Sequence, residues 1–276
     1  MQNTSIRFGI NARLFPSSWR PVREEIAFLA QAGFSCIQIR GQEQGVDQAY
    51  LGDAPELVGE MLRAADIEAV MEIIVILNPA TGRSRAGLTP IQILHNNLPA
   101  IRAMRCSCVH WHMAAASPFQ PEDLPGLEYA MLPQLAQAFD MGQQHGFYFG
   151  LEHNETGLQI FASPESINAA LDAVPGLGFV WDLNHSPAEH MAAYLELAAR
   201  ISMLHLADTP LPTLNHHLPI GQGNVDFAYI FKELDRRDFH GPGILEIGGL
   251  PKSGGYGRDT DEALQDSLMR LRMVEA

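Results

Sequence analysis

Four apolar segments in the second half of the chain each end in a side chain that can bind a metal ion. The end residues are Glu152, Asp182, His205 and Glu246. Short apolar runs bounded by turn residues are typical of buried strands, and a carboxylate buried at such a strand tip needs a neutralising partner. Three carboxylates and one imidazole suit Mn, Co, Mg or Zn. The pattern therefore predicts one divalent-metal site built from four successive strands.

Each of these residues also has a simpler interpretation when it is taken alone. A glutamate at a strand end is more often solvated or salt-bridged than functional. His205 could be a satisfied barrel histidine, and Asp182 could cap the helix that follows it. The joint pattern favours the metal site, because each spacing fits one repeat unit and only the last is lengthened, by the loop 209–223.

The segments that must position these residues form a regular series. Apolar runs predict strands at 6–10, 34–39, within 67–77, and at 107–112, 147–152, 177–182, 201–205 and 243–246. Helical periodicity, capping residues and stop signals predict helices at 23–32, 54–65, 90–105, 127–144, 163–174, 188–199, 227–237 and 259–273.

Strands that alternate with helices indicate a parallel sheet, and eight such units indicate a closed (β/α)8 TIM barrel of the α/β class. We expect a single domain over residues 1–276, because the sequence shows no linker or change of composition. Barrel enzymes carry their chemistry at the C-terminal ends of the strands. The four predicted ligands all fall at such ends.

Composition excludes several classes of protein. The formal net charge of −14 argues against binding to a phosphate backbone, so we expect no nucleic acid partner. No apolar stretch is long enough to span a membrane, and the N-terminus lacks the pattern of a secretory signal. The three cysteines form no disulfide framework. We therefore expect a cytoplasmic protein with no membrane association.

Five short motifs resemble those of the xylose-isomerase-like barrel superfamily. They are Leu-Glu-His-Asn at 151–154, Trp-Asp-Leu-Asn-His at 181–185, Leu-His-Leu-Ala-Asp at 204–208, Gly-Gln-Gly at 221–223 and Leu-Glu-Ile at 245–247. This superfamily includes ketose 3-epimerases, hydroxypyruvate isomerases, inosose and 3-dehydroshikimate dehydratases, and endonuclease IV. The motifs identify the superfamily, but they say little about the substrate.

The resemblance implies roles for particular residues. Glu152, Asp182, His205 and Glu246 become the ligands of one divalent ion, and the two glutamates double as acid and base on opposite faces of the substrate. His185, from the Asp-x-x-His motif, becomes a substrate-contacting residue.

Further histidines extend this expected site. His217 lies in a segment that resembles the one with which endonuclease IV helps to bind a further zinc, but Asn215 stands where that enzyme has an acid. His110 and His112 are expected to end the fourth strand, where related proteins bind metal or substrate. We predict that His110 and His217 contact substrate. Gln38 stands where many relatives have glutamate.

These residues predict a metal-dependent isomerase or epimerase that acts on a small carbohydrate or polyol. A metal that chelates two adjacent oxygens polarises the carbonyl, and a glutamate removes the proton from the neighbouring carbon to give a metal-stabilised enediolate. Return of the proton gives epimerisation or isomerisation. Loss of a β-hydroxyl instead gives a dehydratase of the 3-dehydroshikimate or inosose type, which is the main alternative.

Other readings stay open at this stage. The net charge and Asn215 weigh against an endonuclease, and the intact ligand set weighs against a binding protein without turnover. Arg13, Arg83 and Arg85 could hold an anionic substrate, although exposed loop cations are more often solvated. The sequence does not determine whether the chain forms a homo-oligomer.

Overall fold

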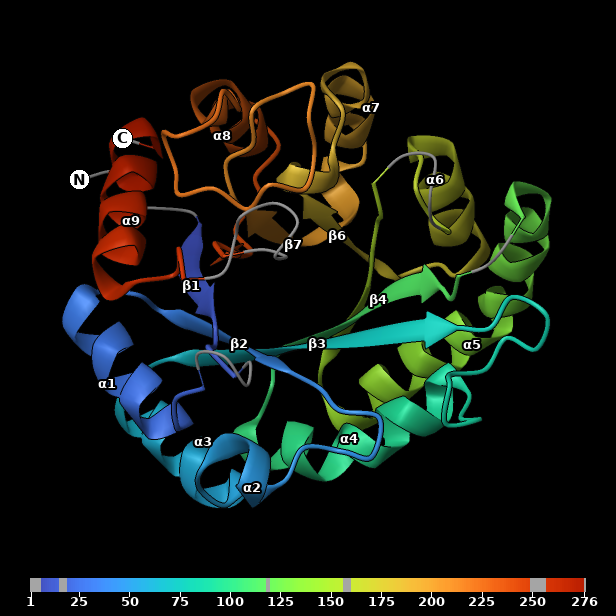
Figure 1. Ribbon diagram of the computed structural model, residues 1–276, viewed down its shortest axis with the longest axis horizontal. Helices are drawn as coiled ribbons and strands as arrows, with labels where there is room; N and C mark the ends of the chain where they lie inside the picture. Colours follow the sequence, from blue (N-terminus) through green and yellow to red (C-terminus); the bar gives the residue numbers. More distant parts are fainter. Residues whose placement is uncertain (1–5, 15–18, 118–119, 156–159, 249–256, 276) are drawn as a thin grey trace.

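The computed structural model describes residues 6–14, 19–117, 120–155, 160–248 and 257–275. In these residues eight parallel strands pair in chain order and close into a barrel (Figure 1). The strands are β1 (Arg7–Asn11), β2 (Cys36–Arg40), β3 (Glu68–Leu77), β4 (Cys108–Ala115), β5 (Tyr148–Glu152), β6 (Gly178–Asp182), β7 (Ile201–Leu206) and β8 (Pro242–Leu245). The predicted (β/α)8 barrel is therefore confirmed.

Helices surround the strands on the outside of the barrel (Figure 1). They are α1 (Val22–Ala32), α2 (Gln48–Leu51), α3 (Pro55–Ala64), α4 (Pro90–Met104), α5 (Leu124–His145), α6 (Pro164–Ala173), α7 (Met191–Glu196), α8 (Phe227–Asp235) and α9 (Asp261–Glu275). Local sequence explains several starts. Thr89 and Gln92 form a capping box at α4, and the Ser163 hydroxyl caps α6. None of the helices in the described ranges is long and apolar enough to cross a membrane.

Three of the predicted segments differ from the structure. The helix expected at 188–199 is interrupted, because short 3₁₀ turns at Ala188–His190 and Ala198–Arg200 flank the six-residue α7. The loop after β2 contains the short helix α2, which Asp47 caps. The fourth strand continues to Ala115 because it pairs with the long β3 up to Leu77, so His110 and His112 lie inside the strand rather than at its end.

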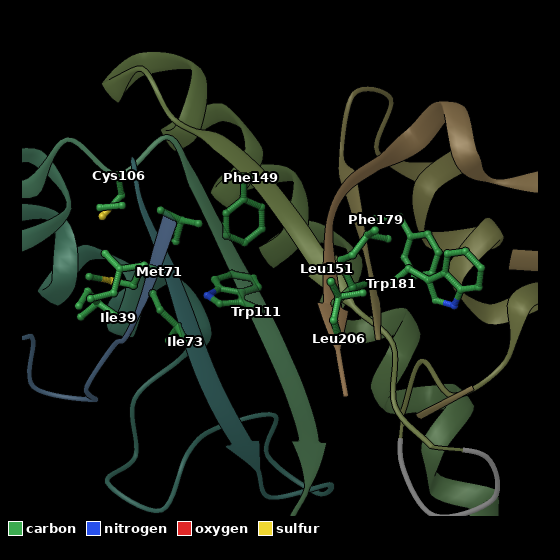
Figure 2. Packing of buried hydrophobic residues seen from close by; sticks show 14 of the residues in the cluster. Ile39, Met71, Ile73, Cys106, Trp111, Phe149, Leu151, Phe179, Trp181 and Leu206 are labelled. Carbon is green, nitrogen blue, oxygen red and sulfur yellow. The ribbon is translucent and has the colours of Figure 1, made fainter. Parts of the chain in front are cut away.

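Most of the core lies between the strands and the surrounding helices. Trp111 and Phe149 pack edge to face there, with ring centroids 4.9 Å apart (Figure 2). A second, smaller cluster consists of buried residues from six different strands. Its members are Cys36, Val70, Cys108, Val180, Met203 and Ile244.

The smaller cluster determines which residues form the site above it. Side chains two positions apart on a strand lie on the same face. Two residues after each member of the cluster comes a polar side chain at the C-terminal side of the barrel. These side chains are Gln38, Glu72, His110, Asp182, His205 and Glu246. The apolar cluster therefore forms the floor of a polar site.

Candidate metal-binding and catalytic site

The structure brings the four predicted metal ligands together. Glu152 and Asp182 are the last residues of β5 and β6, His205 lies near the end of β7, and Glu246 follows β8 directly. The Nδ1 atom of His205 lies 3.3 Å from Glu152 Oε1 and 3.5 Å from Glu246 Oε2. Asp182, His205 and Glu246 each offer a ligand atom within 4.8 Å of the others. Adjacent strands with aligned ends produce this convergence.

The chemistry of these side chains fits a cation. Among the described residues, both carboxylate oxygens of Glu152, Asp182 Oδ2 and His205 Nδ1 are buried and have no hydrogen-bond partner. Buried polar atoms without partners cost about 1–3 kcal/mol each, and more when they are charged. A divalent ion would accept electron pairs from all of these atoms at once. The residues therefore fit the metal that the sequence predicted.

Gln38 connects two of the predicted ligands. Its amide oxygen lies 2.9 Å from His205 Nε2, and its amide nitrogen donates to Glu246 Oε1 over 2.7 Å. An amide oxygen can only accept, so His205 carries a proton on Nε2 and turns its Nδ1 toward the carboxylates. Partners of this kind orient metal-binding histidines. From the sequence alone, Gln38 was noted only because many related proteins have glutamate at this position.

Glu72 and His112 form a second polar group beside Glu152. The Nδ1 atom of His112 lies 3.3 Å from Glu72 Oε1 and 3.5 Å from Glu152 Oε1, while its Nε2 lies 2.8 Å from Asn154 Oδ1. Burial lowers the pKa of His112, but the charges of Glu152 and Glu72 outweigh burial and raise it to about 10. Burial also lowers the pKa of His205, but the charges of Glu246 and Glu152 outweigh it and raise this pKa well above its usual value. Without a metal, both histidines are thus cations that balance these acids.

His110 belongs to the same group of polar side chains above the apolar floor. Its side chain is fully buried, and its Nε2 lies 3.3 Å from Glu152 Oε2. Its ring stands edge-on to that of His205, with centroids 5.1 Å apart. His110, Glu152 and His205 therefore form another group with ligand spacing. His110 stands two residues after the floor residue Cys108, as Asp182 and His205 do on their own strands.

The two glutamates with predicted catalytic roles have different electrostatic surroundings. Burial raises the pKa of Glu152, but nearby His112 and His205 outweigh burial and hold it well below its usual range. Burial raises the pKa of Glu246 to about 8; His205 opposes the rise, and the carboxylates of Glu72, Glu152 and others add to it. A bound cation would favour the ionised form of both. The crowding of acids on this side is therefore a second reason to expect a cation here.

His185 is buried next to two of the predicted ligands. Its Nδ1 lies 3.1 Å from Asp182 Oδ2 and 3.6 Å from Glu152 Oε1. His153 supports this corner from behind, because its buried Nε2 lies 2.9 Å from the backbone oxygen of Asp182. Burial, with the neighbouring His185, lowers the pKa of His153 to about 4. His153 is therefore neutral at physiological pH and acts as a support of the β6 end.

His217 lies beside Glu246 rather than among the predicted ligands. Its Nδ1 donates to the backbone oxygen of Glu246 over 2.7 Å, and its Nε2 lies 2.8 Å from Asn215 Oδ1. The Asn184 side chain accepts hydrogen bonds from the backbone amides of both His216 and His217, each at 3.1 Å. These contacts hold the segment against β8 and give Asn215 a structural role.

The Gly-Gln-Gly motif also has a structural explanation. The Asp208 carboxylate accepts hydrogen bonds from the backbone amides of Gly221 and Val225. A Cβ atom on Gly223 would lie 2.4 Å from Asp208 Oδ1 and from the backbone oxygen of Thr209. The second glycine is therefore required by close packing, and Asp208 anchors the loop.

The three arginines considered as anion ligands have different surroundings. Arg13 is buried and binds Glu25 through two hydrogen bonds of 2.8 and 2.7 Å, and Asp261 through a third of 2.6 Å, so two carboxylates already balance its charge. Arg83 donates to the backbone oxygen of Gly87. Arg85 lines a cavity beside the site.

Comparison with known proteins gives three findings. A family model described as xylose isomerase-like TIM barrel matches residues 26–272. A comparison with curated proteins found no match. Many solved structures share the fold, including several sugar epimerases.

Three of these structures illustrate the similarity. D-allulose 3-epimerase from Methylomonas sp. has a TM-score of 0.73 at 19% identity, with 99% of each chain covered. D-psicose 3-epimerase from Clostridium cellulolyticum H10 has a TM-score of 0.74 at 13% identity, covering 98% of this chain and 99% of the other. 3-Keto-D-glucoside 4-epimerase from E. coli has a TM-score of 0.74 at 17% identity, covering 97% and 99%. At these identities the similarity shows the fold alone.

Proposed function

The chain belongs to the xylose isomerase-like TIM barrel family, and we propose that it is a divalent-metal-dependent sugar or polyol epimerase or isomerase. The observation that carries this proposal is the group of buried, unpartnered ligand atoms on Glu152, Asp182 and His205, next to Glu246. The names of the structural neighbours support the same class, since they act on D-allulose, D-psicose and other sugars.

The residues would divide the work as follows. Glu152, Asp182, His205 and Glu246 would hold the ion, which when bound polarises the substrate carbonyl and stabilises negative charge on its oxygen. The two glutamates come from β5 and β8, on different sides of the barrel opening. One carboxylate would take the proton from the carbon next to the carbonyl, and the other would deliver a proton to the opposite face. General acid–base help of this kind contributes about 10² to 10⁴ in rate.

Epimerisation is reversible, so each glutamate must serve as base for one epimer and as acid for the other. Gln38 and Asn11 donate to the same Glu246 oxygen, Oε1, over 2.7 and 3.2 Å, which leaves Oε2 to face His205 and the substrate. His185, beside Glu152 and Asp182, would hydrogen-bond a substrate oxygen.

Metal analysis and isotope exchange test this proposal. Purified protein should hold about one divalent ion per chain and lose activity with a chelator. In D2O, a turned-over ketose should gain deuterium at the carbon next to the carbonyl. The measurement requires many turnovers, so that internal return of the same proton does not hide exchange.

Three outcomes would contradict the proposal. A protein that stays metal-free after Mn, Co, Zn or Mg is supplied would rule out the site. An isomerised product without solvent deuterium would indicate a hydride shift instead of proton transfer. A product lighter by one water would show the dehydratase chemistry that the same ligands allow.

A further inference from the structure

A cavity of about 950 Å³ lies over the C-terminal ends of β1, β2 and β3. It adjoins the proposed metal site through Asn11, which lines the cavity and donates to Glu246 Oε1 over 3.2 Å. Cavities of roughly 300–1,000 Å³ typically enclose drug-sized ligands. A free hexose has only twelve non-hydrogen atoms, so it would leave much of this space filled by water.

The wall of the cavity is more apolar than a free sugar requires. Residues Glu72, Ile74 and Ile76 alternate along the same face of β3, so the two isoleucines continue the wall outward from the metal site. Ile76 is 52% exposed and lines the cavity together with Trp19, which is 44% exposed. Exposed apolar groups that meet in a concave surface mark binding sites.

The far side of the cavity is built in advance of any ligand. The loop after β2 is held against α4 by the buried side chain of Asn97. This side chain accepts from the backbone N–H of Gln42 over 3.1 Å and donates to the backbone oxygen of Gln42 over 2.7 Å. The Trp19 indole donates to the backbone oxygen of Tyr50 over 2.9 Å. The indole and the loop therefore need no rearrangement to receive a ligand.

Polar groups stand beside these apolar surfaces. Burial raises the pKa of Tyr50 to about 12, so its hydroxyl is neutral, and Arg40 and Gln42 lie close to it. Arg85 and Glu43 also line the cavity. Neutral and charged donors next to an aromatic and an aliphatic wall match a ring that carries hydroxyls on its edge and C–H groups on its faces. A phosphate would use the arginines and leave Ile76 and Trp19 in water.

We propose that the substrate is larger than a monosaccharide: its reacting end binds at the metal, and a glycosidically linked second ring occupies this cavity. The proposal rests on the proposed function for the orientation of the reacting end. The cavity wall formed by Ile74 and Ile76 of β3, together with Trp19, then selects the substrate by its distal ring.

Three sugars with the same reacting end test this inference. They are 6-deoxy-D-fructose, D-fructose 6-phosphate and isomaltulose, in which a glucose ring is linked to O6 of fructose. All three lack a free 6-hydroxyl, so none forms a pyranose ring at the ketose. Binding to the full-length protein loaded with Mn²⁺ can be followed by tryptophan fluorescence, since Trp111 and Trp181 are fully buried and Trp19 is exposed. Isomaltulose should bind at least about tenfold more tightly than 6-deoxy-D-fructose.

Variants locate the effect. Ile76→Ser should weaken isomaltulose binding by about tenfold and leave binding of 6-deoxy-D-fructose unchanged. The matched control is Leu57→Ser on α3, which also removes an exposed aliphatic side chain (45% exposed) but does not line the cavity. Melting temperatures of both variants show whether they fold.

The outcomes separate this inference from the proposed function. Tight isomaltulose binding that Ile76→Ser weakens supports the inference, even if no deuterium enters the sugar and the proposed reaction fails. Equal binding of the three sugars overturns the inference, even if all three sugars take up deuterium from the solvent. Preference for the 6-phosphate, lost in Arg85→Gln, overturns it in favour of an anion subsite. Absence of binding by all three also overturns it.

Discussion

Replacing Gln38 by leucine should weaken metal binding, because this side chain holds two of the proposed ligands. Its oxygen lies 2.9 Å from His205 Nε2, and its nitrogen donates to Glu246 Oε1 over 2.7 Å. Leucine fills a similar volume without a hydrogen-bonding group. The substitution should therefore leave the barrel floor packed. Without the Gln38 amide, however, the His205 ring can rotate or change tautomer, and Glu246 loses a hydrogen-bond donor.

The expected size of the effect follows from these two contacts. Each hydrogen bond contributes about 1 kcal/mol, and 1.4 kcal/mol corresponds to a factor of about ten in affinity. Loss of an outer partner of a metal ligand typically costs about 10- to 100-fold in metal affinity. We therefore expect the Kd for Mn²⁺ or Co²⁺ to rise by about 10- to 100-fold in Gln38→Leu.

Competition with a fluorescent chelator measures this Kd directly, without any need for the natural substrate. Gln42→Leu is the matched control, since its side chain donates to the backbone oxygens of Arg40 and Gly41 and contacts none of the proposed ligands. Circular dichroism and melting temperatures show that both variants fold. Wild-type metal affinity in Gln38→Leu, or equal losses in the two variants, would refute the reasoning.

Three other predictions follow from the site. Glu152→Gln and Glu246→Gln should each abolish turnover, because each removes both a ligand and a proton-transfer group; activity within tenfold of wild type in either variant, from a steady-state assay, would contradict this. His185→Ala should keep its metal and bind substrate poorly, whereas His205→Ala should lose metal; metal analysis showing the reverse would exchange their roles. The pKa of His153 is lowered from 6.5 to about 4, so the unfolded chain takes up the proton first and stability falls as the pH drops from about 6.5 towards 4. The free energy of unfolding should fall by about 3 kcal/mol over this range. Denaturant titrations of His153→Gln, whose amide can still donate to Asp182, should lack this part of the pH dependence. Identical pH profiles of the variant and the wild type would contradict the assignment.

The ends of β5 to β8 could be predicted because the signal is local. Each of these strands is a short apolar run, and Glu152, Asp182 and His205 interrupt such runs at their ends. Regular spacing along the chain then predicted the repeat and the barrel, which the strand order confirms. A parallel sheet brings the ends of neighbouring strands to one edge whatever the details of the loops.

Local signals also misled where neighbours decide the outcome. The sequence of β4 gives no reason for a strand that reaches Ala115; its length follows from pairing with the longer β3, up to Leu77. The 188–199 segment has helical composition, but the observed helix covers only Met191–Glu196. Arg13 resembled a loop cation, yet it is buried against Glu25 and against Asp261, which lies 248 positions away in sequence.

The strands that end in side chains able to hold a metal can be recognised in the chain alone, since period-two alternation and apolar runs are properties of a single segment. The residues that support these side chains become visible only in the folded barrel. Gln38 meets His205 and Glu246 across 167 and 208 positions of sequence, and Glu72 meets His112 across 40. Such pairs depend on barrel closure and strand register, which place distant polar side chains two residues above the apolar floor. No local pattern encodes these contacts, because they are properties of the closed sheet.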